Sequence, residues 1–380
     1  MDDLQLHARL IGQQGSRAAL NTPVLVLDRD QLDRNIAAMQ ALATAGGVAL
    51  RPHAKTHKSV DIARRQLAAG AVGVCCAKIG EAEVLADGGI ADILITSPVA
   101  APAAIARLAA LAGRSPGLMA TVDHPAVVAR LQQALAEAGT TLDVVIDVDP
   151  GIRRTGVASP EAAVALAQAV AAADAMTLRG VQFYCGAQQH IEDYAARRTA
   201  IVERSAYLAR VIAALTDAGY PPAIVTGSGT GTHRIDLDLG IFTELQAGSY
   251  VFMDRQYLDC DLTGEGASPF PPSLAVDARV VSANHAALVT IDAGFKSLST
   301  DGGVAQVQRG AAPETIFAFM GDEHAALVAP GIGTALRPGD PVTLTVPHCD
   351  PTVNLYDHYH VVADETLVAI WPVSARGRAR

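Results

Sequence analysis

Aromatic side chains are scarce in this chain: they make up 4% of its 380 residues, although half of all residues are hydrophobic. Alanine, valine, leucine and isoleucine must therefore fill most of the core. Small and branched aliphatic side chains suit layers of helices packed on sheets better than an aromatic-rich β-sandwich. The length predicts one large domain with a second one beside it, or two domains of middling size.

An excess of positive charge is also missing, since 29 Lys and Arg stand against 39 Asp and Glu and the formal net charge is −10. This balance argues against a nucleic-acid-binding protein, which would usually carry a basic face. The five cysteines form an odd set without framework spacing, which argues against a disulfide scaffold. No apolar run of about 18 residues and no apolar signal core occur, so we expect a cytoplasmic enzyme without a membrane span.

Residues 22–262 alternate between short apolar strands and helices of 10–15 residues, as in "LDVVIDVDPG" followed by "SPEAAVALAQAVAAA". Near-continuous apolar strands separated by helices indicate parallel strands covered by helices. About eight such units predict a (β/α)8 TIM-like barrel rather than an open sheet. After the Gly/Pro-rich stretch "DLTGEGASPFPPS", short alternating strands follow. We expect residues 1–21 and 263–380 to form a mostly β domain.

In a barrel the active site lies where the strands end. The segment "RPHAKTHK" ends an early strand and carries Lys55 and Lys58 between His53 and His57. Burial and nearby positive charge would lower the pKa of such a lysine and let it react with a carbonyl group. The alternative for either lysine is an ordinary solvated loop residue.

Other strand ends carry polar clusters as well. "VTGSGTGT" (225–232) offers backbone amides and hydroxyls that suit a phosphate. Together with a strand-end lysine, it indicates pyridoxal phosphate. "DVDPGIRRTG" supplies Arg153 and Arg154, and "QFYCGAQQH" supplies Tyr184 and His190. Each of these residues, taken singly, has a structural alternative as a surface or core residue.

The combination of "RPHAKTHK", "VDPGIRRTGV", "QFYCGAQQH", "TGSGT" and "PHCDPTVNLYDHY" resembles the D-threonine aldolase and D-serine dehydratase family. The resemblance extends over residues 22–372 and implies an alanine-racemase-like barrel that binds pyridoxal phosphate, a C-terminal β domain and a homodimer. It implies that Lys55 is the lysine that binds the cofactor covalently. The residues that it places around the cofactor are Arg154 at the phenolic oxygen, Tyr184, Gly227, Ser228, Gly229 and Thr230 at the phosphate, and Tyr250.

The segment "PHCDPT" (347–352) has three adjacent residues that can bind a metal. It follows the alternating run "VTLTV", so we expect it to continue a strand, with His348 and Asp350 on one face and Cys349 on the other. The resembling dehydratases have a cysteine where this chain has Asp350. A carboxylate favours Mn²⁺ or Mg²⁺, with Zn²⁺ as the alternative, and so favours the aldolase branch. His358 and His360 follow nearby and are expected to be structural.

The resemblance implies a lyase that cleaves the Cα–Cβ bond of D-β-hydroxy-α-amino acids, with D-threonine giving glycine and acetaldehyde. His190 is the candidate base for the β-hydroxyl proton. The principal alternative is a dehydratase of D-serine or D-threo-3-hydroxyaspartate. An amino-acid racemase and a non-catalytic pyridoxal-phosphate-binding protein are further, weaker alternatives.

Overall fold

The computed structural model describes residues 3–266 and 268–380, which divide into two compact units. The barrel unit comprises Ala38–Gly248, Cys260–Ala267 and Gly377–Arg380. The β unit comprises Met1–Ala37, Ser249–Asp259 and Ser268–Arg376. Within the described residues, every helix is too short or too polar to traverse a lipid bilayer.

Eight parallel strands form the barrel unit, in the order β2-β9-β8-β7-β6-β5-β4-β3. A parallel bridge between His53 and Cys75 joins the two outer strands, β2 and β3. The strands are β2 Ala49–Leu50, β3 Val74–Cys76, β4 Ile93–Ile95, β5 Met119–Val122, β6 Leu142–Asp147, β7 Met176–Phe183, β8 Ile224–Gly227 and β9 Glu244–Leu245. The TIM-like barrel predicted from the strand–helix rhythm is confirmed.

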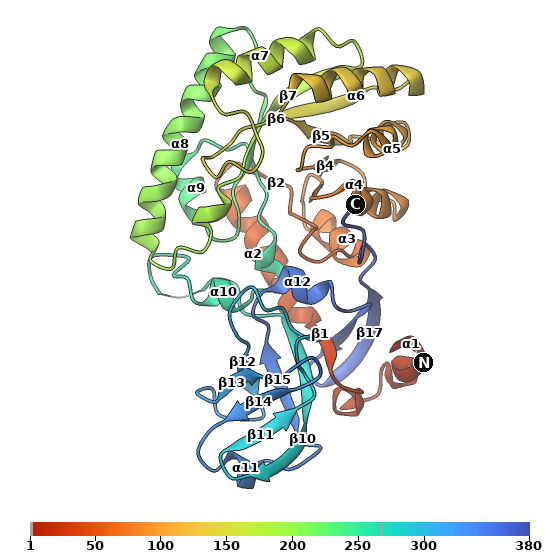
Figure 1. Cartoon of the computed structure of the whole chain (residues 1–380), viewed down its shortest axis with the longest axis vertical. Coiled ribbons are helices and arrows are strands. Elements are labelled where there is room, and N and C mark those ends of the chain that lie inside the picture. The colour runs from red at the N-terminus through yellow and green to blue at the C-terminus, as the bar shows by residue number, and fades with distance from the viewer. Residues whose placement is uncertain (1–2, 267) are drawn as a thin grey trace. The chain divides into compact units, whose positions relative to one another are not determined.

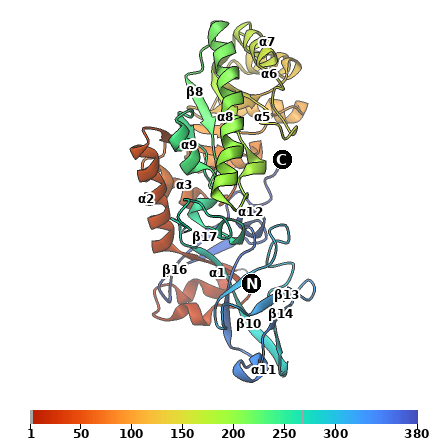
Figure 2. The same ribbon diagram turned by 90° about the vertical axis from the view of Figure 1, so that its left-hand side faces the viewer.

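Helices follow most of these strands and lie on the outside of the sheet (Figure 1). They are α2 Arg29–Ala45, α3 Val60–Ala68, α4 Ile79–Asp87, α5 Pro102–Ala112, α6 Pro125–Ala138, α7 Pro160–Ala171, α8 Tyr194–Asp217 and α9 His233–Leu239, with the short turn η3 Gly186–Gln188. Proline in the first turn of α5, α6 and α7 presets the helical backbone without losing a hydrogen bond. The long helix α8 packs against α7 and α9 (Figure 2).

The barrel unit contains an apolar cluster, and one of its strand positions leaves no room for a side chain. Cys75, Leu94, Met119 and Val145, from four neighbouring strands, form one buried cluster. Gly180 on β7 has φ 157°, and a Cβ atom there would lie 1.8 Å from the carbonyl oxygen of Ile224 on β8. Glycine is therefore required for these two strands to pair.

The β unit is built on a nine-stranded sheet. Its strands are β1 Val24–Asp28, β10 Leu274–His285, β11 Leu288–Ile291, β12 Gln306–Arg309, β13 Ile316–Phe319, β14 Ala325–Val328, β15 Pro341–Thr345, β16 His358–Ala363 and β17 Thr366–Pro372. Its short helices and turns are α1 Asp3–His7, η1 Ala8–Leu10, η2 Ser16–Ala19, η4 Ser249–Val251, α10 Arg255–Leu258, α11 Ile332–Ala335 and α12 Cys349–Val353.

The predicted domain boundary at residue 22 differs from the observed division. Strand β1 pairs antiparallel with β10 and parallel with β16, so it belongs to the sheet of the β unit. The barrel unit starts at residue 38, within α2. Locally, β1 and α2 look like one more strand–helix unit, and only the long-range pairing separates them from the barrel.

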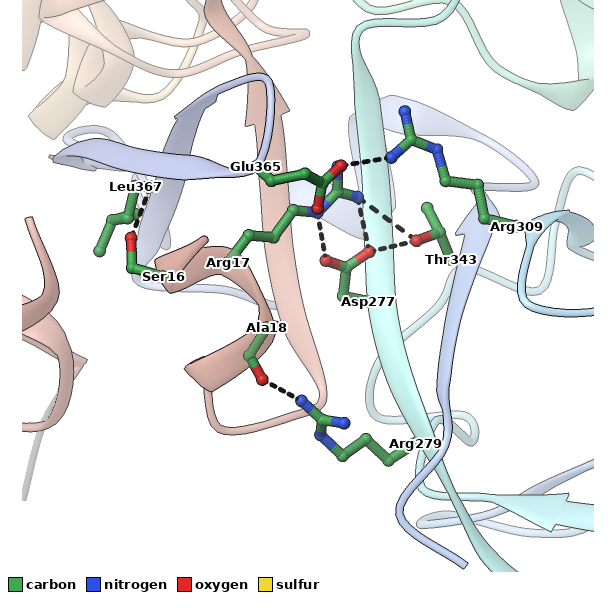
Figure 3. Close-up of polar contacts among 9 residues, drawn as sticks. All are labelled: Ser16, Arg17, Ala18, Asp277, Arg279, Arg309, Thr343, Glu365 and Leu367. Atoms are coloured by element: carbon green, nitrogen blue, oxygen red, sulfur yellow. Dashed lines mark hydrogen bonds and ion pairs between the residues drawn. The ribbon is translucent and has the colours of Figure 1, made fainter. Parts of the chain in front are cut away.

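The N-terminal segment is fixed to the β-unit sheet by a charged cluster (Figure 3). The largely buried guanidinium of Arg17 pairs with Asp277 on β10 at 2.8 Å. Glu365 lies 3.7 Å from Arg17 and 2.6 Å from Arg309 on β12. The hydroxyl of Ser16 accepts a hydrogen bond from the backbone amide of β17 at 2.9 Å. These contacts explain why residues before 22 belong with the C-terminal sheet.

Candidate active site

Lys55 lies in the loop that follows β2, and His53 fixes the loop backbone. His53 Nδ1 accepts from the Lys55 amide at 3.4 Å, while Nε2 lies 3.0 Å from the hydroxyl of Thr96. That hydroxyl donates its own proton to the Cys76 carbonyl at 3.1 Å, so His53 must donate from Nε2. With one nitrogen accepting and the other donating, His53 is neutral.

His57 is also held in a neutral form, because its Nδ1 accepts from the Ser59 amide at 3.1 Å and its Nε2 lies 3.2 Å from Gln66 Oε1. The expectation that neighbouring histidines supply positive charge to the lysines is therefore wrong. Their role is to hold the loop, and Lys55 itself is half-buried at the barrel mouth.

Lys58 has a dedicated carboxylate partner. Its ammonium group is buried against Glu81 of α4, and its backbone adopts φ 50°. Glu81 also accepts hydrogen bonds from the backbone amides of Ala77 and Lys78, at 2.9 and 3.3 Å. Lys58 thus neutralises a buried helix-capping carboxylate, and the assignment of Lys55 as the catalytic lysine stays a prediction.

Arg154 and Tyr184 come together from two strand exits. The exposed guanidinium of Arg154, in the loop after β6, lies 5.9 Å from the ring centre of Tyr184, which follows β7. This arrangement is a cation–π contact. The neighbouring Arg153 has a backbone φ of 56°. The choice of Arg154 over Arg153 as the cofactor arginine stays a prediction.

The barrel unit also contains a buried polar network that sequence analysis missed. Gln182 on β7 donates to Asp147 at the end of β6 at 2.9 Å and to the Thr96 carbonyl at 2.8 Å. Gln246 donates to the Gln182 side chain at 3.3 Å and to the Thr226 hydroxyl at 3.0 Å. The sequence signal that could have revealed this network is the presence of polar residues at the carboxyl ends of otherwise apolar strands.

Asp147 is the charged member of this network. Burial raises its pKa to about 6, although hydrogen bonds from Thr155 and Gln182 and the charge of Arg154 act in the opposite direction. Asp123 raises the pKa further. A carboxyl group with a pKa close to neutral pH beside a strand exit is typical of an active site.

The residues Gly227–Thr230 form a fully buried turn after β8, with Ser228 at φ 69°. Within the part of the chain that the structure describes, the backbone amides of Ser228 and Gly229 donate to no acceptor. Gln189 supports the turn from the other side, since its Oε1 accepts from the Gly231 amide at 3.0 Å. A Cβ atom on Gly229 would lie 2.4 Å from this oxygen. Unpaired amides in a glycine-rich turn fit an anionic group such as phosphate.

The candidate base His190 and the candidate cofactor residue Tyr250 lie in different surroundings. His190 is exposed in the loop after η3, on the same strand exit as Tyr184. Tyr250 belongs to η4 of the β unit, where it is fully buried with its ring 5.7 Å from that of Phe270. The roles given to both residues stay predictions.

The segment around His348 and Asp350 does not continue a strand. β15 ends at Thr345, and α12 begins at Cys349 with His348 as its N-cap. The strand-alternation argument is therefore wrong. Pro351 does not keep the chain extended, because proline is tolerated in the first helical turn.

His348 nevertheless has the environment of a metal ligand. Its Nδ1 lies 2.8 Å from the carboxylate of Asp301, and its side chain is 22% exposed. Metal-binding histidines usually donate their second nitrogen to a carboxylate in this way, which leaves Nε2 for the ion. The donor set of imidazole and the Asp350 carboxylate fits a divalent metal, and Asp301 is a supporting residue that sequence analysis missed.

Cys349 is unsuited to this role. Its thiol is fully buried, and burial raises its pKa well above the usual range, with Asp254 and Asp350 raising it further. Its amide donates to Asp254 at 2.8 Å, so the residue is anchored at the start of α12. Full burial of the side chain argues against Cys349 as an accessible ligand.

His360 belongs to a second histidine pair in the β unit. His7 Nδ1 lies 2.8 Å from His360 Nε2, and one ligand atom from each of Asp3, His7 and His360 lies within 4.8 Å of the others. The Asn21 amide donates to His7 Nε2 at 2.9 Å, so the His7 proton resides on Nδ1, between the two rings. The pair is therefore a hydrogen bond that holds α1 to β16, as expected for a structural His360.

Known families cover both parts of the chain. The family described as "Alanine racemase, N-terminal domain" matches residues 27–256, and "Putative serine dehydratase domain" matches residues 273–362. The chain is 38% identical over 363 residues to 3-hydroxy-D-aspartate aldolase of Paracoccus denitrificans (strain Pd 1222), covering 94% of this chain and 93% of that protein. It is 38% identical over 369 residues to D-threonine aldolase of Arthrobacter sp, covering 96% and 94%.

A solved structure agrees with these relatives. The crystal structure of D-threonine aldolase from Filomicrobium marinum has a TM-score of 0.91 at 38% identity, with 96% of this chain and 97% of that chain covered. Both the fold and the family expected from the sequence are thereby confirmed.

Proposed function

Because the chain belongs to the alanine-racemase-like family that includes the D-threonine and 3-hydroxy-D-aspartate aldolases, we propose that it cleaves D-β-hydroxy-α-amino acids between Cα and Cβ. The reaction uses pyridoxal phosphate and a divalent metal, and D-threonine gives glycine and acetaldehyde. The observation that carries the proposal is the set of residues at one barrel mouth: Lys55, the Arg154–Tyr184 pair and the unpaired amides of Ser228 and Gly229.

The cofactor residues are assigned by their chemistry. Pyridoxal phosphate, when bound, withdraws electrons from Cα of an amino acid. Lys55 is the lysine that holds it covalently, because Lys58 is committed to Glu81. The amides of Ser228 and Gly229 would donate to the phosphate, and Arg154 would supply positive charge for the phenolic oxygen.

The β-hydroxyl of the substrate must lose a proton as the Cα–Cβ bond breaks. His190, exposed at the exit of β7, is the residue to which we assign this proton. His348 and Asp350 would hold the divalent ion, which lowers the pKa of a hydroxyl bound to it. The Asp350 carboxylate favours Mn²⁺ or Mg²⁺ over Zn²⁺.

The second candidate function is dehydration of the same class of substrate, which the match of residues 273–362 to a serine dehydratase domain favours. A dehydratase removes the Cα proton and expels the β-hydroxyl, so its product is a 2-oxo acid with ammonia. Fold does not separate the two reactions, because both use one scaffold. A homodimer and a cytoplasmic location stay predictions.

Product analysis with D-threonine tests the proposal. The protein is treated with EDTA, then supplied with Mn²⁺ or Zn²⁺, and its products are identified. Glycine with acetaldehyde is the expected result, whereas 2-oxobutanoate with ammonia would establish the dehydratase. Lys55→Ala should lose both turnover and the visible cofactor absorbance. Lys78→Ala, an exposed lysine of the same unit, is the matched control and should retain both.

A further inference from the structure

Gln189 is a fully buried residue that contacts two strand exits of the barrel unit. It caps the C-terminal end of η3, in the loop that follows β7, and it directly precedes the exposed candidate base His190. Its side chain reaches the glycine-rich turn that follows β8. One residue therefore touches both the loop that carries His190 and the turn whose unpaired amides suit a phosphate.

The side-chain amide of Gln189 has a hydrogen-bond partner for each of its polar atoms. Oε1 accepts from the Gly231 amide at 3.0 Å, and Nε2 donates to the Cys185 carbonyl at 3.3 Å and to the Thr232 hydroxyl at 3.1 Å. A backbone amide only donates and a carbonyl only accepts, so these partners fix which side-chain atom is oxygen and which is nitrogen. The side chain thus bridges Cys185 in one loop to Gly231 and Thr232 in the other.

Two glycines of the turn are required because Gln189 approaches so closely. A Cβ atom on Gly229 would lie 2.4 Å from Gln189 Oε1, and a Cβ atom on Gly231 would lie 2.0 Å from the Gln189 carbonyl oxygen. Any side chain at either position would displace Gln189 or open the turn. The glycine pattern of this segment therefore reflects the packing of Gln189 as well as a site for an anion.

The hydrogen bonds of the turn leave its first amides unpaired. Gln189 binds the Gly231 amide, and the His233 amide donates to the Gly229 carbonyl at 2.9 Å. Within the described part of the chain, the amides of Ser228 and Gly229 are left without an acceptor, although both residues are buried. Buried unpaired amides cost free energy, so this end of the turn is the part that gains most from an anion.

A second buried side chain holds the loop on the other side of His190. The guanidinium of Arg197, which is fully buried on α8, donates to the carbonyl of Ile191 and, at 3.3 Å, to that of Glu192. His190 therefore lies exposed in a segment that is fixed before and after it. Of the two anchors, Gln189 is the one that also shapes the glycine-rich turn.

We propose that Gln189 is a positioning residue that couples the phosphate turn to His190. The inference rests on the proposed lyase function, in which His190 takes the β-hydroxyl proton. The amide of Gln189 holds the turn in the shape that receives the phosphate, and it also holds the loop from which His190 acts. Loss of its hydrogen bonds therefore weakens cofactor binding through the phosphate group and slows the step that needs the base.

Cofactor affinity tests the first part of the proposal. The apoprotein is titrated by equilibrium dialysis with pyridoxal phosphate and with pyridoxal, which has the same aldehyde but no phosphate. Gln189→Met retains the length of the side chain and removes its hydrogen bonds. This variant should raise the Kd of pyridoxal phosphate about tenfold and that of pyridoxal less than about twofold. Equal rises for the two ligands would show a general structural role, and they overturn the proposal, as does an unchanged Kd of pyridoxal phosphate.

Gln188→Met is the matched control. Gln188 is the adjacent residue of the same type, and its Oε1 has no hydrogen-bond partner among the residues that the structure describes. The same substitution there should leave both dissociation constants unchanged. A tenfold loss of pyridoxal phosphate affinity in this control would overturn the assignment to Gln189.

Thr232→Val is a milder form of the same perturbation, and it decides the question if Gln189→Met does not fold. It removes the acceptor for Gln189 Nε2 and retains the shape of the side chain. The Kd of pyridoxal phosphate should rise about threefold, with that of pyridoxal unchanged. Equal changes for the two ligands overturn the proposal here as well.

A double-mutant cycle tests the second part, with D-threonine as substrate and pyridoxal phosphate at saturation. Gln189→Met should lower kcat about tenfold when His190 is present and less than about twofold in the His190→Ala background, because it acts through His190. Additive effects of the two substitutions overturn the coupling. Failure of the wild type to cleave any D-β-hydroxy amino acid overturns the lyase function instead, and the dialysis experiments, which need no turnover, then decide on Gln189.

Discussion

Acidification from pH 7.5 to pH 5 should destabilise the β unit through the buried pair of His7 and His360. His7 donates from Nδ1 to His360 Nε2 and accepts from the Asn21 amide at Nε2. A proton added to either ring would place two donors face to face. Asp3 and His358, which meet at 3.2 Å, are the other titratable groups beside the pair. The pair can therefore persist only while both rings are neutral.

The size of the effect follows from the pKa of His360. Burial lowers this pKa to about 4 from 6.5, with a smaller lowering from His7 and a partial opposing effect of Asp3. The unfolded chain therefore binds the proton first as pH falls, and stability is lost between pH 6.5 and pH 4. The shift should lower the free energy of unfolding by about 2 kcal/mol at pH 5 and by about 3 kcal/mol at pH 4. Above pH 6.5 this loss of stability is absent.

Trp371, the only tryptophan of the chain, provides the assay. It lies on β17 opposite Tyr359 of β16, one residue from His360, so its fluorescence reports the sheet that carries the pair. Urea unfolding is measured at pH 7.5 and pH 5 for the wild type and for His360→Gln. The glutamine retains an acceptor for His7 but cannot titrate. The loss of stability on acidification should be about 2 kcal/mol smaller in the variant, and equal losses in the two proteins would refute the reasoning.

Two further predictions concern the metal site and the barrel. Asp301→Asn should weaken Mn²⁺ binding about 10- to 100-fold, because Asp301 orients His348. Titration of the metal-free protein with Mn²⁺ measures the affinity. An unchanged affinity in the variant would contradict the prediction. Gly180→Ala should cost about 3 kcal/mol or prevent folding, since its Cβ would meet the Ile224 carbonyl at 1.8 Å. Gly113→Ala, where the nearest atom would be 3.7 Å away, is the control, and equal melting temperatures of the two variants would contradict the steric argument.

The barrel could be predicted from sequence because its strands are buried on both faces, which makes them continuous apolar runs between helices. Its first boundary could not be predicted in the same way. Residues 24–45 carry the same strand–helix pattern, yet β1 pairs with β10, some 250 residues away in the chain, and with β16. Local periodicity contains no information on such partners.

The candidate site shows the same division between local and long-range information. Sequence motifs predict roles for Lys55, Arg154 and the glycine-rich turn, since each lies in a short distinctive segment. The difference between Lys55 and Lys58 depends on Glu81, which lies on another helix. The neutral state of His53 depends on Thr96 at a different strand exit. Protonation states are set by partners that only the fold brings together.

The assignment of His348 and Asp350 has to stand on grounds other than strand geometry. In α12 the side chains do not alternate between two faces, so the exclusion of Cys349 by alternation no longer holds. Full burial of the thiol argues against Cys349 on independent grounds. The Asp301 carboxylate supports His348 at the nitrogen that a metal would not use. The imidazole and the Asp350 carboxylate stay the predicted donor pair, and the expected preference for a hard divalent cation rests on the carboxylate rather than on the direction of a strand.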